Sequence, residues 1–190
     1  KTQLKMVLHD GAFKGCKNLK EFNMYYLVTE GTNHYQILYP WDIYIGEDVF
    51  DRKIGIIGCG SLGSNLAELL VGCGCNKFAF YDNQILTTEN IARHVCGFSD
   101  VGLNKVDALS EKLSHHNPNV ISERHSCDIH SILGSNIEML NDNDYLILTV
   151  ANAPIEYRCV KSYMNGHIKK PLVIMWVEPY AIAGHALILN

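Results

Sequence analysis

The sequence has little of several features that mark whole classes of protein. Acidic and basic residues nearly balance, with 16 Lys and Arg against 20 Asp and Glu, so no basic surface is expected for nucleic acid or an anionic membrane. No apolar stretch reaches the roughly 18 residues of a membrane-spanning helix, and no signal peptide is recognisable. Seven cysteines are an odd count without a C-x-x-C pair, which favours free thiols in a cytoplasmic protein.

The first 51 residues contain no arginine, and the first arginine of the chain is Arg52. No internal repeat or low-complexity tract occurs. A chain of 190 residues with 47% hydrophobic content can bury one ordinary core, so we expect one domain with a short appendage. The chain begins at Lys1 without a methionine and stops at Asn190 after an apolar run. We therefore expect it to be part of a longer protein.

The appendage covers residues 1–50 and is predicted to hold a β-hairpin. Residues 22–28 and 34–39 are rich in Tyr, Val, Ile and Leu, and they flank the turn sequence Glu30-Gly31-Thr32-Asn33. Such a pattern is typical of two paired strands. No chemistry is assigned to this segment.

The main domain is predicted to cover residues 51–190, where short apolar runs alternate with longer amphipathic segments. This alternation predicts a Rossmann-like α/β fold with a doubly wound, mostly parallel sheet flanked by helices. Ligands of such sheets lie beyond the carboxyl ends of the strands. The expected strands are 54–57, 77–81, 120–125, 145–150, 172–176 and 185–189, and the expected helices are 62–71, 103–116, 130–140 and 155–164.

A glycine-rich motif, G-x-G-x-x-G, follows the first of these strands and opens a helix. Its first glycine permits a tight turn, the second lets backbone amides approach phosphates, and the third lets helix and strand pack closely. Asp82 ends the second strand, where a carboxylate would accept hydrogen bonds from ribose hydroxyls. This pattern predicts a nucleotide site for NAD or ATP, with the candidate residues Gly58, Gly60, Ser61, Gly63 and Asp82.

Further along the chain, five features follow one another in order. They are Asp82 at a strand end, Asn90 to Arg93, Gly102 to Lys105, Asn117-Pro118 and Lys170-Pro171-Leu172-Val173. In this order they resemble the adenylating superfamily that contains the ThiF and MoeB proteins and the ubiquitin-activating enzymes, and the resemblance covers about residues 52–190.

The resemblance implies an enzyme that uses ATP and Mg²⁺ to adenylate a carboxylate. The expected substrate is the C-terminus of a ubiquitin-like or sulfur-carrier protein, and a homodimer is expected. Arg93, Lys105 and Asn90 are the implied catalytic and nucleotide-binding residues. Their chemistry suits this role, because a reaction between anions needs cations and donors around the triphosphate.

Two departures from the family concern the triphosphate. Where the family has a Mg²⁺-binding aspartate after the fourth strand, this chain has Thr149-Val150-Ala151-Asn152-Ala153. Asn152 occupies that region and is a weak ligand for a hard cation; Glu156 or Glu178 are possible substitutes. The appendage also lacks the arginine that many members deliver from an N-terminal helix.

Residues 176–185 resemble a bacterial branch in which this domain is fused to conjugating-enzyme-like or JAB-protease-like domains. No pattern of basic neighbours singles out one cysteine as a nucleophile, although Cys96 closely follows Arg93 and His94. We therefore expect any transfer cysteine beyond Asn190, and no paired C-x-x-C motif suggests zinc. Two other functions stay open. One is a non-catalytic module that dimerises or holds a partner, and the other is an NAD-dependent oxidoreductase.

Overall fold

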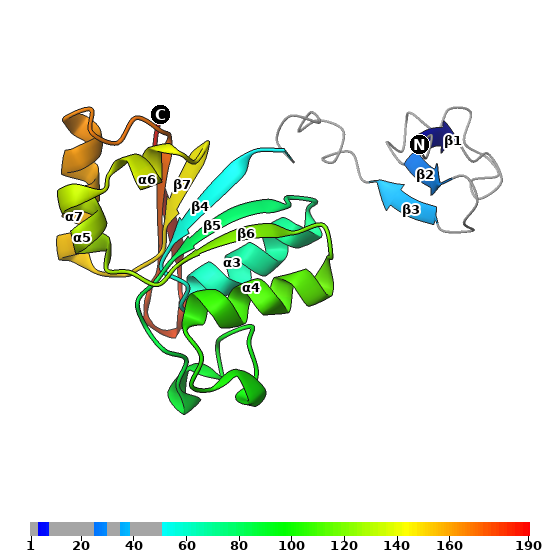
Figure 1. Ribbon diagram of the computed structural model, residues 1–190, viewed down its shortest axis with the longest axis horizontal. Helices are drawn as coiled ribbons and strands as arrows, with labels where there is room; N and C mark the ends of the chain where they lie inside the picture. The colour runs from blue at the N-terminus through cyan, green and yellow to red at the C-terminus, as the bar shows by residue number, and fades with distance from the viewer. Residues whose placement is uncertain (1–3, 8–24, 30–34, 39–50) are drawn as a thin grey trace. The chain divides into compact units, whose positions relative to one another are not determined.

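The computed structural model describes residues 4–7, 25–29, 35–38 and 51–190 (Figure 1). The chain divides into two compact units, Lys1–Val49 and Phe50–Asn190. In the first unit, strands β1 (Leu4–Val7), β2 (Tyr25–Thr29) and β3 (Tyr35–Leu38) form an antiparallel sheet in that order. Strands β2 and β3 pair as the two arms expected of a hairpin, whereas the expected turn lies outside the described residues. Strand β1 is an element that the sequence analysis did not predict.

A six-stranded sheet forms the centre of the second unit, in the order β6-β5-β4-β7-β8-β9. Every neighbouring pair is parallel except β8 and β9, which are antiparallel. The predicted Rossmann-like, mostly parallel sheet is therefore confirmed. The strands are β4 (Lys53–Ile57), β5 (Lys77–Tyr81), β6 (Ile121–His125), β7 (Tyr145–Leu148), β8 (Leu172–Val177) and β9 (Gly184–Leu189).

The strand order positions the site. From β4 the chain builds outward through β5 to β6, and then returns to the other side of β4 to form β7. The order of the strands thus reverses between β4 and β7, and open α/β sheets bind ligands in the crevice at the carboxyl ends of such a strand pair. The loops after Ile57 and Leu148 meet at this point.

Helices cover both faces of the sheet (Figure 1). Helices α3 (Ser61–Gly72) and α4 (Lys105–His116) lie on one face, and α5 (Ile129–Ser135), α6 (Glu138–Asn141) and α7 (Ala153–Met164) lie on the other. Strands β4 and β5 are buried between them along almost their whole length. This burial explains their continuous apolar sequences, which are typical of central parallel strands.

The sequence analysis was wrong about one helix. It predicted a single helix over 130–140, but the chain forms α5 and α6, separated at Asn136. Asn136 ends α5 in a non-helical conformation. Apolar residues continue at helical spacing through the break, so hydrophobic periodicity alone predicts one uninterrupted helix.

Two hydrophobic clusters hold the second unit together, one on each side of the sheet. The first includes Phe78, Phe80 and Leu109 under α3 and α4, and the second includes Leu146 and Leu148 under α5 and α7. Among the helices that the structure describes, none is long and apolar enough to cross a membrane.

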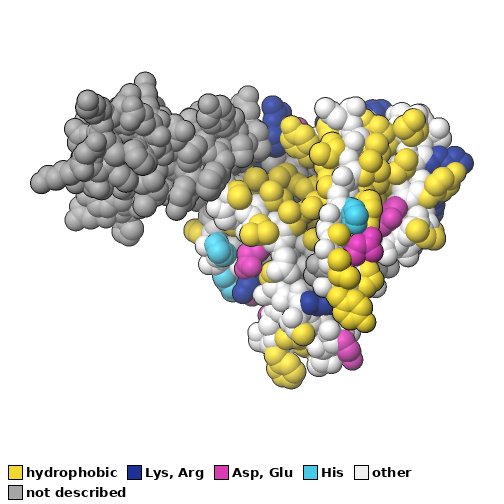
Figure 2. All heavy atoms as spheres, turned by 180° about the vertical axis from the view of Figure 1, so that it is seen from behind, with side chains coloured by type: hydrophobic (Ala, Val, Ile, Leu, Met, Phe, Trp, Pro, Cys, Tyr) yellow, Lys and Arg dark blue, Asp and Glu magenta, His cyan; other side chains and the backbone are white. Residues whose placement is uncertain are grey.

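Strand β9 is one of the two edge strands of the sheet and is largely exposed. Figure 2 views this side of the second unit and shows hydrophobic side chains gathered along it. The turn between β8 and β9 contains the short 3-10 helix η4 (Pro179–Ala181). The exposed apolar residues at this end of the sheet are Val177, Tyr180, Ile182, Leu187 and Ile188.

Candidate functional site

The glycine loop between β4 and α3 has two glycines that the fold requires and one that it does not. Gly58 has a φ of +94°, which disfavours any other residue. A Cβ atom on Gly63 would lie 1.9 Å from the carbonyl oxygen of Gly58, so helix and strand could not pack as they do. At Gly60, by contrast, a Cβ atom would meet no heavy atom within 4 Å. Gly60 therefore faces open space at the start of α3.

Thr149, directly after β7, fixes this loop from the neighbouring strand. Its buried hydroxyl lies 2.6 Å from the carbonyl oxygen of Gly58 and 3.2 Å from that of Ile57. The loop is thus held in place by a side chain 91 residues further along the chain. The sequence analysis quoted Thr149 but did not assign it this role.

Asp82 directly follows β5 and lies beside the glycine loop. Its two carboxylate oxygens accept hydrogen bonds from the backbone amides of Cys59 and Gln84, each at 2.8 Å. Each oxygen keeps a further lone pair. Asp82 therefore both ties the glycine loop to β5 and offers acceptors to a ligand.

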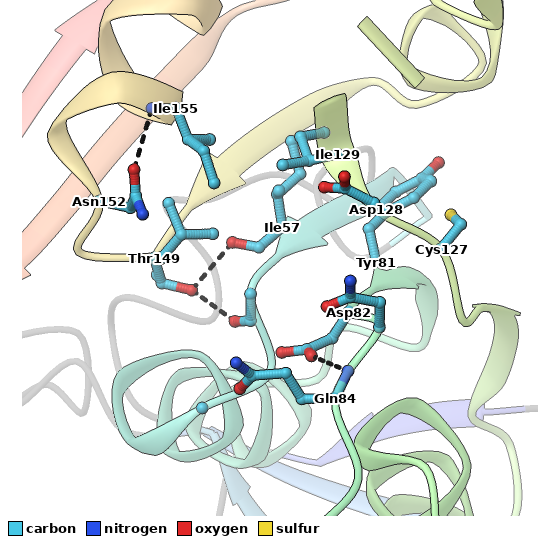
Figure 3. Close-up of a pocket in the computed structure, with 14 residues that line it drawn as sticks. Ile57, Tyr81, Asp82, Gln84, Cys127, Asp128, Ile129, Thr149, Asn152 and Ile155 are labelled. Atoms are coloured by element: carbon cyan, nitrogen blue, oxygen red, sulfur yellow. Dashed lines mark hydrogen bonds between the residues drawn. The ribbon is translucent and has the colours of Figure 1, made fainter. Parts of the chain in front are cut away.

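A cavity of about 200 Å³, here called the smaller cavity, opens beside Asp82 (Figure 3). The carboxyl groups of Asp82 and Asp128 both point toward it. Asp128 begins helix α5 after β6, and its Oδ1 accepts a hydrogen bond from the amide of His130. The sequence analysis missed Asp128. An aspartate directly before a helix and just after a strand was the available signal, because ligands lie at the carboxyl ends of parallel strands.

A larger cavity, of about 730 Å³, adjoins the smaller one. Both are lined by Gly60, Gln84, Thr149 and Val150, so they form one continuous depression around the glycine loop. The larger cavity is also lined by four residues that the sequence analysis selected. They are Ser61, Asn90, Arg93 and Lys105.

Lys105 is buried at the edge of the larger cavity, with 5% of its surface exposed. Its Nζ donates to the Oε1 atom of Gln84 at 2.7 Å. Within the described part of the chain, no carboxylate forms an ion pair with this ammonium group. A buried charge beside a neutral acceptor is costly. The site is thus complementary to an anion next to Lys105.

Arg93 presents its side chain to the same cavity, while its backbone holds the glycine loop. Its carbonyl oxygen accepts hydrogen bonds from the hydroxyl of Ser61 at 3.1 Å and from the side-chain amide of Asn65 at 3.0 Å. The side chain is exposed, and the described residues make no ion pair with it. The guanidinium group is therefore available to a ligand in the cavity.

Asn90 is partly committed to local structure. Its Oδ1 accepts hydrogen bonds from the amide of Thr87 at 3.1 Å and from the hydroxyl of Thr87 at 3.3 Å. These bonds cap the 3-10 helix η2 (Thr88–Asn90). The side-chain NH₂ group of Asn90 remains as a donor for the larger cavity.

A family model described as the ThiF family matches residues 37–174, which is more than half of the chain. The chain belongs to the ThiF family. It is 35% identical over 88 residues to ubiquitin-like modifier-activating enzyme 5 of Oryza sativa subsp. japonica, covering 46% of this chain and 21% of the relative. It is 39% identical over 80 residues to the ATP-dependent ubiquitin transferase-like protein Cap2 of Enterobacter hormaechei subsp. hoffmannii. This match covers 42% of this chain and 13% of the relative.

Solved structures show the same fold. The crystal structure of E. coli MccB with ATP matches with a TM-score of 0.62 and 18% identity, over 71% of this chain and 39% of that chain. The structure of PaaA matches with a TM-score of 0.62 and 24% identity, over 75% of this chain and 45% of the PaaA chain. The ThiF-family chain thus spans less than half the length of these proteins and a smaller part of the curated relatives above.

His94 is a site residue of the ThiF-family chain to which the sequence analysis gave no role. It is buried, and its Nε2 lies 2.7 Å from the carbonyl oxygen of Cys59. Its Nδ1 accepts a hydrogen bond from the amide of Cys96 at 3.1 Å. This arrangement fits a neutral imidazole with its proton on Nε2. Burial lowers the pKa of His94, and the hydrogen bond to Cys59 partly offsets that shift.

The residues around Asn152 do not fit a Mg²⁺ ion held by the protein. Oδ1 of Asn152 accepts a hydrogen bond from the amide of Ile155 and begins helix α7. Glu156 accepts a hydrogen bond from the amide of Asn152 through its Oε1 atom, and Glu178 pairs with His185 at 3.2 Å. In the described ranges, no group of three or more His, Cys, Asp or Glu side chains is arranged to bind a metal ion.

The thiols close to the site are poor nucleophiles. Cys59 and Cys96 are buried, and burial raises the pKa of Cys96 to about 12 and that of Cys59 well above its ordinary value. Cys159, the buried residue of α7, likewise has a pKa raised to about 12 by burial. A nucleophilic cysteine needs the opposite shift.

Proposed function

We propose that the chain binds ATP and adenylates the C-terminal carboxylate of a ubiquitin-like or sulfur-carrier protein. The observation that carries this proposal is the position of Lys105, a buried cation without a carboxylate partner in the described chain, on a cavity continuous with Asp82. Family membership supports adenylation of a carboxylate in general. The names of the relatives, which include a ubiquitin-like modifier-activating enzyme, support this class of substrate.

The nucleoside would occupy the smaller cavity, with its ribose hydroxyls donating to Asp82. The phosphates would lie over Gly60 at the start of α3, where free backbone amides and the helix dipole favour anionic oxygens. The triphosphate would then lie in the larger cavity, which Arg93 and Lys105 line. Nucleotide binding would thus neutralise the positive charge of the buried Lys105 ammonium group.

In the reaction, an oxygen of the substrate carboxylate forms a bond to the α-phosphorus of ATP. The bond from this phosphorus to the bridging oxygen of the β-phosphate breaks, so that an acyl adenylate forms and pyrophosphate leaves. No covalent bond to the protein is required. Arg93 and Lys105 hold the anionic groups together and stabilise the charge that develops on the leaving pyrophosphate.

The test is exchange of labelled pyrophosphate into ATP by the full-length protein with its candidate partner. We expect exchange only when a partner with a free C-terminal carboxylate is present. Arg93→Ala should abolish exchange but leave the fold intact. Lys112→Ala is the matched control, because Lys112 is exposed on α4 and lines neither cavity.

Two outcomes would replace the proposal. ATP binding without exchange, together with partner binding that survives Arg93→Ala, would identify a non-catalytic module. Tight NADH binding without ATP binding would identify an oxidoreductase. A homodimer and a cytoplasmic location belong to the same proposal, as does a fusion to further domains of the bacterial type.

A further inference from the structure

We propose that this site binds its nucleotide without any protein side chain on the divalent cation, so that Mg²⁺ enters only as part of the nucleotide. The inference rests on the nucleotide site of the proposed function. It concerns which groups neutralise the negative charge of the phosphates. In this chain the side chains of Arg93 and Lys105 would do so directly, and no carboxylate would hold a metal ion beside them.

The first argument is that the side chains after β7 are already engaged. The oxygen of the Asn152 side chain caps α7 through the amide of Ile155 at 3.2 Å. A carboxylate oxygen of Glu156 accepts from the amide of Asn152 at 3.1 Å. The two side chains thus form a reciprocal cap at the start of α7. Neither side chain lines the larger cavity, and loss of either bond to the start of the helix would cost about 1 kcal/mol.

The second argument is the residue before this cap. Ala151 lines the larger cavity that Arg93 and Lys105 also line. Its φ is +48°, in the left-handed region where Asn and Asp are several-fold enriched over other non-glycine residues. The backbone at position 151 is therefore suited to an aspartate that faces the cavity. A methyl group stands there instead, and it cannot bind a cation.

The third argument concerns the other carboxylates near the site. Asp82 and Asp128 line the smaller cavity but not the larger one that Arg93 and Lys105 line. Glu178 lines the larger cavity and pairs with His185. Mg²⁺ is bound in proteins by one or two carboxylates in addition to phosphate oxygens and water. In the larger cavity, phosphate oxygens and water would therefore complete its shell.

Lys105 offers the compensating charge. It is a buried ammonium group whose protein partner is the neutral Oε1 atom of Gln84. Together with Arg93 it supplies two fixed positive charges to the larger cavity. These charges interact with phosphates whether or not a metal ion is present. Removal of Mg²⁺ should therefore leave nucleotide affinity intact.

The test is the dissociation constant of ATP for the full-length chain, measured by calorimetry with Mg²⁺ and with a chelator. For the natural sequence, we expect the two constants to agree within about 3-fold, or ATP to bind more tightly without the metal ion. Ala151→Asp should introduce a metal dependence of about 10-fold or more, equivalent to about 1.4 kcal/mol. Ala151→Asn is the matched control, because it suits the same backbone without adding a charge.

The result that overturns the inference is ATP binding by the natural chain that weakens 10-fold or more on chelation. Loss of that dependence in Glu178→Gln would identify the ligand that we exclude. Failure of the proposed function gives a different result. If folded natural protein does not bind ATP under either condition, both proposals fail, whereas binding that requires Mg²⁺ defeats only the present one.

Discussion

His94 joins the glycine loop to the segment that carries Arg93, because its Nε2 lies 2.7 Å from the carbonyl oxygen of Cys59. The carbonyl oxygen of Arg93 in turn accepts a hydrogen bond from the hydroxyl of Ser61 at the start of α3. These two contacts fix the glycine loop and the backbone of Arg93 to each other. Their relative position is a property of the fold, and we expect it to exist before a nucleotide binds.

The His94 contact predicts a pH dependence of stability. Burial lowers the pKa of His94 below the ordinary value of 6.5, so the folded protein resists protonation more than the unfolded chain does. The free energy of unfolding should keep this contribution above pH 6.5 and lose it as the pH falls through the lowered pKa. Urea titrations across this range measure it. His94→Gln keeps a donor and an acceptor but does not titrate, and an unchanged pH slope in this variant would contradict the assignment.

Substitutions in the glycine loop should separate folding from binding. Gly60→Ala adds a methyl group that meets no protein atom within 4 Å, at a φ of −77° that alanine accepts, so stability should change by less than about 0.5 kcal/mol. Affinity for ATP should fall about 10-fold or more, because the methyl group occupies the approach to the backbone amides. Thermal unfolding and ATP titration measure the two effects.

Gly63→Ala is the matched contrast. Its new Cβ atom would lie 1.9 Å from a backbone oxygen, which cannot move aside as a flexible side chain does. We expect a loss of more than about 3 kcal/mol in the free energy of unfolding. A Gly63→Ala protein with natural stability would show that helix α3 and strand β4 do not pack as described.

Lys105→Met should weaken binding without weakening the fold. The substitution removes a buried charge, and the exposed Gln84 can replace the lost hydrogen bond with water. The free energy of unfolding should stay constant or rise. ATP affinity should fall by about 10- to 150-fold, equivalent to about 1.5 to 3 kcal/mol for a hydrogen bond to a charged group. A destabilised variant with natural ATP affinity would mean that Lys105 serves the core alone.

Asp82→Asn should cost stability as well as affinity. The two carboxylate oxygens accept from two backbone amides, and an asparagine has only one acceptor atom to replace them. We expect a loss of about 1 to 3 kcal/mol, measured by urea unfolding. Asp128→Asn is the control, because its single bond to the amide of His130 uses one oxygen and asparagine is also a good N-cap. Equal losses in both variants would refute this explanation.

The sequence predicted those parts of the fold and site that depend on local pattern. Strands β4 and β5 are continuous apolar runs, and the glycine motif with Asp82 lies within one strand-helix-strand unit. Arg93 and Lys105 were selected through the family resemblance rather than through their own neighbours. The structure places both on the larger cavity.

Two of the missed roles depend on contacts between distant residues. His94 reaches a carbonyl group 35 positions away, and Thr149 reaches one 91 positions away. The sequence around His94 and Thr149 contains no hydrophobic or motif pattern that indicates these contacts. The break between α5 and α6 was missed for a different reason, because Asn136 at the end of α5 does not interrupt the spacing of apolar residues.

The unequal roles of the three glycines affect how such motifs should be compared among related proteins. Gly58 and Gly63 are fixed by backbone conformation and by packing, so selection for a stable fold alone would preserve them. Gly60 is constrained only by what occupies the space beside it. In a lineage that gave up its nucleotide, the outer glycines should persist while the middle one drifts. The residue at the position of Gly60 should therefore distinguish relatives that still bind a nucleotide from relatives that have kept only the fold.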